Sequence, residues 1–136
     1  MAVLRFKQID HPSDVGIIAY GKDRKEIFEN AAYGMFSIIA DLNTVEAAQS
    51  LKVKVEANDP EELLVNWLNE LLYIFETKKM LCKEFRIKKM DNKKLDAEVI
   101  GEEINPARQT LYSAIKAATY NQLQIGENQA KIVFDI

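Results

Sequence analysis

The residues best suited to chemistry lie near the two ends of the sequence. Near its start, Ile9 to Gly16 reads Ile-Asp-His-Pro-Ser-Asp-Val-Gly and combines two aspartates with the only histidine. At its end, the Asp135 side chain adjoins the α-carboxylate expected on Ile136. A proline-restricted connector between two strands is a favourable place for functional groups. The simpler alternative is a turn in which Asp10 or Asp14 caps its own backbone.

These acidic groups predict a hard-cation site if the two ends meet in space. Three carboxylates would then converge, from Asp14, Asp135 and Ile136. Like charges at close range need compensation, which a proton, a Lys or Arg, or a divalent cation can supply. Calcium and magnesium both prefer oxygen ligands. One cysteine and one histidine cannot build a zinc site, so a metal here would be held mainly by oxygen.

The sequence offers little support for an enzyme. It contains no Gly-rich phosphate loop and no defensible Ser–His–Asp arrangement. His11 could serve as a general base, but no nucleophile or substrate proton is identifiable beside it. A metal-dependent hydrolase using His11 with Asp10 or Asp14 is therefore the less favoured alternative to a non-enzymatic protein.

Length and composition predict one globular domain spanning residues 1–136. Hydrophobic residues make up 48% of the chain and charged residues 29%, which is ordinary for a folded protein. The net charge of −3 gives no global positive field to attract nucleic acid. The apolar runs are too short to span a membrane, and no signal peptide is recognisable. We expect a cytoplasmic monomer or weak oligomer with no membrane segment.

The elements that must position these groups follow from hydrophobic periodicity. We predict strands over residues 2–8 and 15–20, and a helix over 23–41 that begins at the capping residue Asp23. A half-buried strand should cover 51–57. A second helix should then begin at Asp59 and Pro60 and continue to Phe75. Trp67 falls on its apolar stripe, which favours a core position over a partner anchor.

The second half of the chain is dominated by strands. A hairpin is predicted from 83–89 and 94–100, followed by a connector over 101–110, a strand in the second half of 111–125 and a last strand over 130–136. Eight of the 18 Lys and Arg lie between Lys78 and Lys94. Without interleaved aromatics, this basic segment indicates a solvated hairpin rather than an RNA surface. The element order predicts an α+β fold, with two helices covering a mostly antiparallel sheet.

Four ordered blocks of the sequence resemble the archease family. The first is Asp10 to Gly16, which is similar to the family signature Asp-His-x-Ala-Asp-x-Gly. The other blocks are Phe28-Glu29-Asn30-Ala31-Ala32, then Leu64-x-x-Trp67-Leu68-Asn69-Glu70-Leu71-Leu72-Tyr73, and Ile115-Lys116-Ala117-x-Thr119-Tyr120 with the terminal Asp135-Ile136. The resemblance covers nearly the whole chain.

The resemblance implies an accessory protein rather than an enzyme. Archeases assist the GTP-dependent RNA ligase of tRNA splicing and RNA repair by promoting its guanylylation, and their fold is similar to a domain of the chaperone Hsp33. Some members have been described as chaperone-like or as modulators of tRNA modification. The family's metal site maps onto Asp14, Asp135 and Ile136, with calcium the expected ion and magnesium or manganese as alternatives. The implied partner is the RNA ligase, and the sequence itself indicates no direct nucleic-acid binding.

The chain departs from the family pattern at three positions. Where many members have His, Glu and His around the Lys-Ala-x-Thr-Tyr block, this chain has Gln109, Ala114 and Asn121. Polar groups that could contact the ligase or support the metal are therefore altered. The second aspartate of the first signature, Asp14, is retained.

Overall fold

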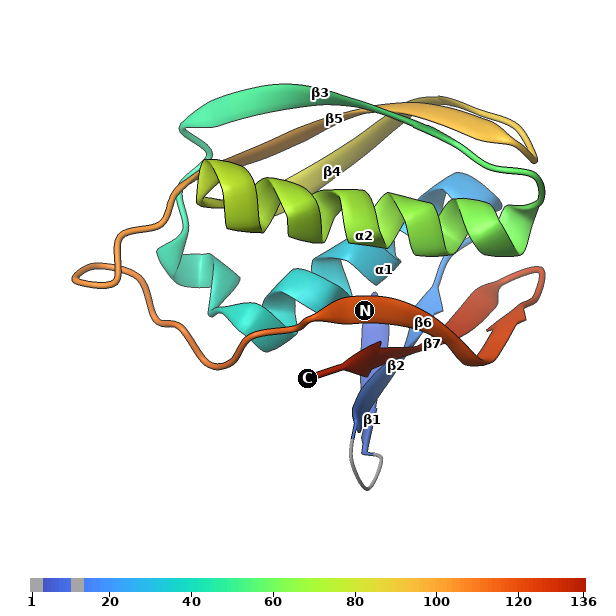
Figure 1. Ribbon diagram of the computed structural model, residues 1–136, viewed down its shortest axis with the longest axis horizontal. Helices are drawn as coiled ribbons and strands as arrows, with labels where there is room; N and C mark the ends of the chain where they lie inside the picture. Colours follow the sequence, from blue (N-terminus) through green and yellow to red (C-terminus); the bar gives the residue numbers. More distant parts are fainter. Residues whose placement is uncertain (1–3, 11–13) are drawn as a thin grey trace.

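Two antiparallel sheets enclose a layer of two α-helices in the computed structural model, which describes residues 4–10 and 14–136 (Figure 1). The helices are α1, Arg24–Ile39, and α2, Pro60–Lys78, with a short 3₁₀ helix at Leu42–Thr44. The strands are β1 Phe6–Asp10, β2 Asp14–Tyr20, β3 Gln49–Glu56, β4 Met80–Met90, β5 Lys94–Glu103, β6 Ala117–Ile125 and β7 Gln129–Asp135. None of the described helices is long and apolar enough to cross a membrane.

The four-stranded sheet joins the first strands of the chain to the last ones. Its strand order is β1-β2-β7-β6, so β7 lies between β2 and β6. The three-stranded sheet has the order β3-β5-β4 and forms from the contiguous middle of the chain. The predicted α+β class and element order are confirmed, but the strands divide into two sheets with the helices between them.

The core lies where the two helices meet the inner faces of both sheets. Trp67 is fully buried, and its indole Nε1 donates to the carbonyl of Phe28 at 3.0 Å. The prediction that Trp67 is a core residue is therefore confirmed. Both predicted helix caps are also present, because Asp23 accepts from the N–H of Glu26 and Asp59 from that of Glu62.

Several predicted boundaries are wrong because pairing between strands extends the local pattern. The connector predicted over 9–16 is shorter, since Ile9 and Asp10 pair with Gly16 and Val15. The strand at 94–100 continues to Glu103, because 101–103 pair with the start of β4. In the other direction, β7 stops at Asp135, and Ile136 lies just beyond it.

Candidate functional site

Asp14 and Asp135 face each other across the β2–β7 ladder. They are directly paired, and Ala117 of β6 pairs with Asp135 on the other side. Directly opposite residues in antiparallel strands have Cα atoms about 4.5–5.5 Å apart and side chains on the same face. The fold therefore brings together the two carboxylate side chains that the sequence singled out from opposite ends of the chain.

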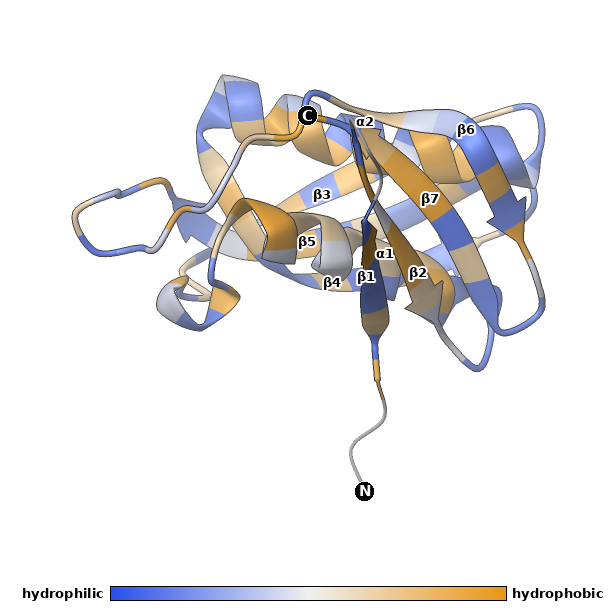
Figure 2. Cartoon of the chain, turned by 90° about the horizontal axis from the view of Figure 1, so that it is seen from below, coloured by the Kyte–Doolittle hydropathy of each residue, from blue (hydrophilic) through white to orange (hydrophobic). Residues whose placement is uncertain are grey.

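Asp14 and Asp135 lie on the faces of β2 and β7 that point away from the helices. The neighbours of the two aspartates, Val15 and Phe134, are buried in the core between sheet and helices. Successive side chains in a strand point to opposite faces, so Asp14 and Asp135 project from the outer face. A slip of β7 by one residue would turn Asp135 towards the core and Ile132 and Phe134 away from it, and the hydrophobic pattern of β7, visible in Figure 2, opposes such a slip.

The end of the chain lies beside this pair. The backbone N–H of Lys116 donates to the carbonyl of Asp135 at 2.8 Å, which holds the end of β7 against the start of β6. Ile136 follows directly and is half exposed. Asp14, Asp135 and Ala117 thus form a row across three strands, the aspartate row, in which Ala117 contributes only a methyl group.

The donor chemistry of the row fits a hard divalent cation. Two neighbouring carboxylates supply the oxygen ligands that calcium and magnesium prefer. Within residues 4–10 and 14–136, no three His, Cys, Asp or Glu side chains gather closely enough to form a metal group alone. A cation here would therefore need the α-carboxylate of Ile136, carbonyl oxygens or water as further ligands. His11, the candidate general base, lies outside the described residues.

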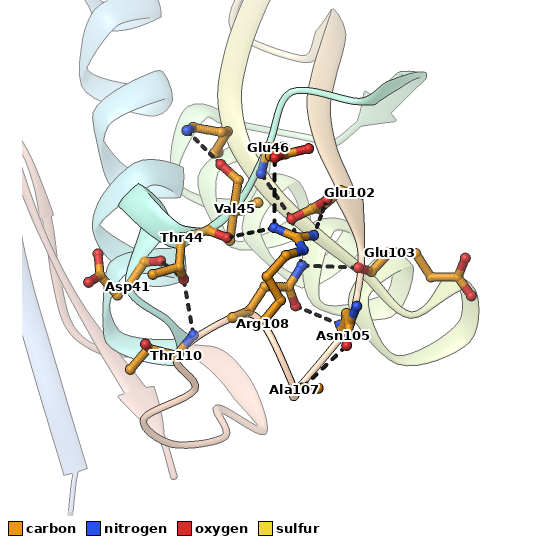
Figure 3. Close-up of polar contacts among 12 residues, drawn as sticks. Asp41, Thr44, Val45, Glu46, Glu102, Glu103, Asn105, Ala107, Arg108 and Thr110 are labelled. Atoms are coloured by element: carbon orange, nitrogen blue, oxygen red, sulfur yellow. Dashed lines mark hydrogen bonds and ion pairs between the residues drawn. The ribbon is translucent and has the colours of Figure 1, made fainter.

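A second polar cluster, which the sequence did not reveal, surrounds Glu102 (Figure 3). Its buried carboxylate accepts from Arg108 at 2.6 Å, from the Gln109 amide at 2.8 Å and from the backbone N–H of Glu46 at 3.0 Å. These hydrogen bonds, with that of Arg108 the largest cause, lower the pKa of Glu102 to about 2. The cluster fixes the connector that leaves β5 at Glu103.

The Glu102 cluster includes Gln109, one of the three positions where the sequence predicts a departure from the family pattern. Gln109 is buried, and its side chain also accepts from the N–H of Asn105 at 2.7 Å and donates to the carbonyl of Glu103 at 3.1 Å. It therefore anchors the connector from within, which leaves it unavailable as a surface contact. Ala114 and Asn121 are both exposed.

The connector between β5 and β6 is tied to α1 and the 3₁₀ helix by its backbone. Thr110 donates to the Thr44 hydroxyl at 3.0 Å, and its carbonyl accepts from the N–H of Asp41 at 2.9 Å. Tyr112 donates to the carbonyl of Ile39 at 2.8 Å. These hydrogen bonds hold the part of the connector that lies between the Glu102 cluster and Lys116, just before β6.

A large open cavity lies at the far end of β2 from the aspartate pair. Its volume is about 860 Å³, and its lining includes Arg5, Tyr20 and Asn30. Arg5 stacks over Tyr33, with its guanidinium carbon 3.7 Å from the ring centroid, and donates to Asn30 at 2.8 Å. Because Tyr20 and Asp14 are at opposite ends of β2, this cavity does not place a substrate beside the carboxylates.

Comparison with known proteins gives a consistent match. Residues 6–136 match the Archease protein family. The chain is 36% identical to the protein archease of Methanosarcina barkeri over 97% of its own length and 96% of that protein. It is also 36% identical to the protein archease of Methanothermobacter thermautotrophicus, over 96% and 98% of the two chains.

Two solved structures share the fold. The solution structure of Methanobacterium thermoautotrophicum protein 1598 superposes with a TM-score of 0.81 at 34% identity, covering 97% of this chain and 99% of that one. The crystal structure of a Thermotoga maritima archease, described as a possible chaperone, has a TM-score of 0.57 at 18% identity over the full length of both chains. At that identity the second likeness concerns the fold alone.

Proposed function

The chain belongs to the archease family, and from this premise we propose that it is an accessory protein of a GTP-dependent RNA ligase. On this proposal it acts in the cytoplasm, in tRNA splicing and RNA repair, by promoting guanylylation of the ligase. The observation that carries the proposal is the direct pairing of Asp14 with Asp135. A pair formed by the exposed Asp135 and the half-buried Asp14, with no nucleophile identified in the sequence beside it, suits an accessory role better than an enzyme.

Under this proposal, Asp14, Asp135 and the α-carboxylate of Ile136 hold a divalent cation, with calcium favoured and magnesium or manganese as alternatives. A divalent cation stabilises the negative charge that develops on phosphate oxygens during nucleotidyl transfer. The two aspartates bind and orient it. The β2–β7 ladder keeps their carboxylates on one face, where a partner protein can approach.

Guanylylation of a purified cognate ligase in a single turnover tests this proposal. We expect the protein to accelerate the reaction, and the variants Asp14→Asn and Asp135→Asn each to reduce that acceleration about tenfold or more, equivalent to about 1.4 kcal/mol. Glu127→Gln is the matched control, since Glu127 is an exposed carboxylate in the β6–β7 turn. Unchanged rates with both aspartate variants would exclude a role for the pair.

A chaperone-like or tRNA-modification accessory role is the second candidate. Tyr73, Tyr112 and Tyr120 are more than half exposed and could contact a client, which favours this alternative. By contrast, the apolar stripe of α2 around Trp67 and Leu68 is buried. Strong binding of a hydrophobic dye by the folded protein would support the second candidate over the first.

A further inference from the structure

Asn69 of α2 closes the free edge of β6. The strand is the last in its sheet, so within residues 4–10 and 14–136 one side of its backbone has no neighbouring strand. The N–H of Ala118 donates to Asn69 Oδ1 at 2.8 Å, and Asn69 Nδ2 donates to the Ala118 carbonyl at 3.2 Å. A side-chain amide presents the same donor and acceptor as a peptide group. The Asn69 side chain thus makes the two hydrogen bonds that a residue of a neighbouring strand would make.

The two hydrogen bonds between Asn69 and Ala118, here called the Asn69 clamp, lie close to the aspartate row, because Ala118 follows Ala117. Ala117 pairs with Asp135, which pairs with Asp14. The start of β6 has only a short regular ladder with β7, from Ala117 to Thr119, before a bulge interrupts the register until Gln124. The two bonds to Asn69 therefore hold this part of the strand together with those from the Lys116 N–H to Asp135 and from the Thr119 hydroxyl to Val133.

We propose that Asn69 is a positioning residue that fixes the start of β6 and, through it, the end of β7 that carries Asp135 beside Asp14. The inference deepens the proposed function, because it assigns a support to the proposed cation site. Asn is a poor choice for a helix interior on propensity alone. Its place in α2 follows instead from its contact with the edge strand.

The chain supplies a matched control one turn earlier on the same helix. Asn66 is half-buried like Asn69, and its Nδ2 donates to the carbonyl of Glu56 at 3.1 Å. Glu56 ends β3, in the other sheet, away from the aspartate row. Both residues tie α2 to a strand through a side-chain amide, but only Asn69 ties it to β6.

The calcium affinities of the variants Asn69→Ala and Asn66→Ala, measured by titration calorimetry, should differ. We expect Asn69→Ala to weaken calcium binding about 10- to 100-fold, the usual effect of removing a group that orients metal ligands. Asn66→Ala should change calcium affinity less than about twofold. If both variants, at similar melting temperatures, lose the same calcium affinity, a general loss of stability explains the result and the inference is wrong.

Amide hydrogen exchange of the metal-free protein tests the clamp without any ligand. Asn69→Ala should accelerate exchange at Lys116, whose N–H donates to Asp135, while Asn66→Ala should not. Unchanged protection at Lys116 would overturn the inference. Asn69→Leu, which keeps the branched shape of the side chain and removes both hydrogen bonds, repeats the test if the alanine variant does not fold. Absence of calcium binding by the unmodified protein would instead overturn the proposed cation site.

Discussion

Glu102 shows how one buried carboxylate can organise a connector of the chain. Its oxygens accept from Arg108, Gln109 and the backbone of Glu46, so the charge is well compensated although the side chain is buried. Charge-assisted hydrogen bonds of this kind are stronger than neutral ones. Removing the carboxylate would leave the buried amide of Gln109 without its principal acceptor.

The lowered pKa of Glu102 predicts a loss of stability in acid. Its folded-state pKa is about 2, below the ordinary value of 4.5. The stabilisation is therefore fully present above about pH 4.5 and is lost as the pH falls towards 2. Urea unfolding between pH 6 and 2.5 should show this decrease, and Glu102→Gln should flatten it. Parallel pH profiles for the two proteins would contradict the prediction.

The two aspartates of the candidate site were predictable from the sequence, but the groups around them were not. Asp14 and Asp135 stood out by residue type and by family resemblance, whereas their direct pairing is a register between strands at opposite ends of the chain. No local pattern encodes such a register. Gln109 and Asn69 were missed as structural residues because the partners of a single amide depend on tertiary contacts that periodicity does not report.

Among the elements, the sheet edges receive different protection. The edge of β4 is covered by α1, since the Glu29 carboxylate accepts from the N–H of Ile87 at 2.9 Å. Burial raises the pKa of Glu29 despite this hydrogen bond. The edge strand β3 instead carries Lys52 and Lys54 on its exposed face. Covering by a helix and exposed lysines both oppose association of proteins through the edges of their sheets.

The long pairing of β4 with β5 depends on Gly101. A Cβ added there would collide with the carbonyl of Leu81 and lie 2.8 Å from the Cα of Cys82, both of which are backbone atoms. We expect Gly101→Ala to lower the free energy of unfolding by about 1–3 kcal/mol in urea titrations, as overpacking does.

Gly126 is the matched control for this substitution. An added Cβ would meet only the carbonyl of Gln129, at 3.4 Å. Gly126→Ala should therefore be neutral or slightly stabilising, by up to about 1 kcal/mol. Equal effects at the two glycines would show that Gly101 is not sterically constrained.

The helices were the most predictable elements. Asp23 and Asp59 mark their starts with side-chain caps, and Pro60 occupies the first turn of α2, so local chemistry is sufficient. The division of strands into two sheets was not predictable. Alternation indicates which face of a strand is buried, but it does not say which other strand lies beside it.

At the scale of the whole molecule, the cation site proposed at Asp14, Asp135 and Ile136 should couple ligand binding to global stability. A ligand that binds only the folded state stabilises it by about 2.7 kcal/mol at a hundred times its Kd. We therefore expect calcium to raise the melting temperature of the protein. Comparison with magnesium and manganese would identify the preferred ion.

The calcium effect should depend on all three proposed ligands. The double variant with Asp14→Asn and Asp135→Asn should lose the shift in melting temperature. An extension after Ile136, which converts its α-carboxylate into an amide, should reduce the shift. A shift of the same size in all of these proteins would place calcium elsewhere.

The strand order also has a consequence for synthesis on the ribosome. The three-stranded sheet and α2 come from one continuous stretch of the chain, in the order β3, α2, β4 and β5. They can therefore fold as soon as this stretch emerges. β2 and β6 must wait for β7, which lies between them and is the last of the described strands in the sequence. A nascent chain therefore has no aspartate pair until β7 has emerged, although Asp14 is made early, so any task that needs this pair must wait for β7.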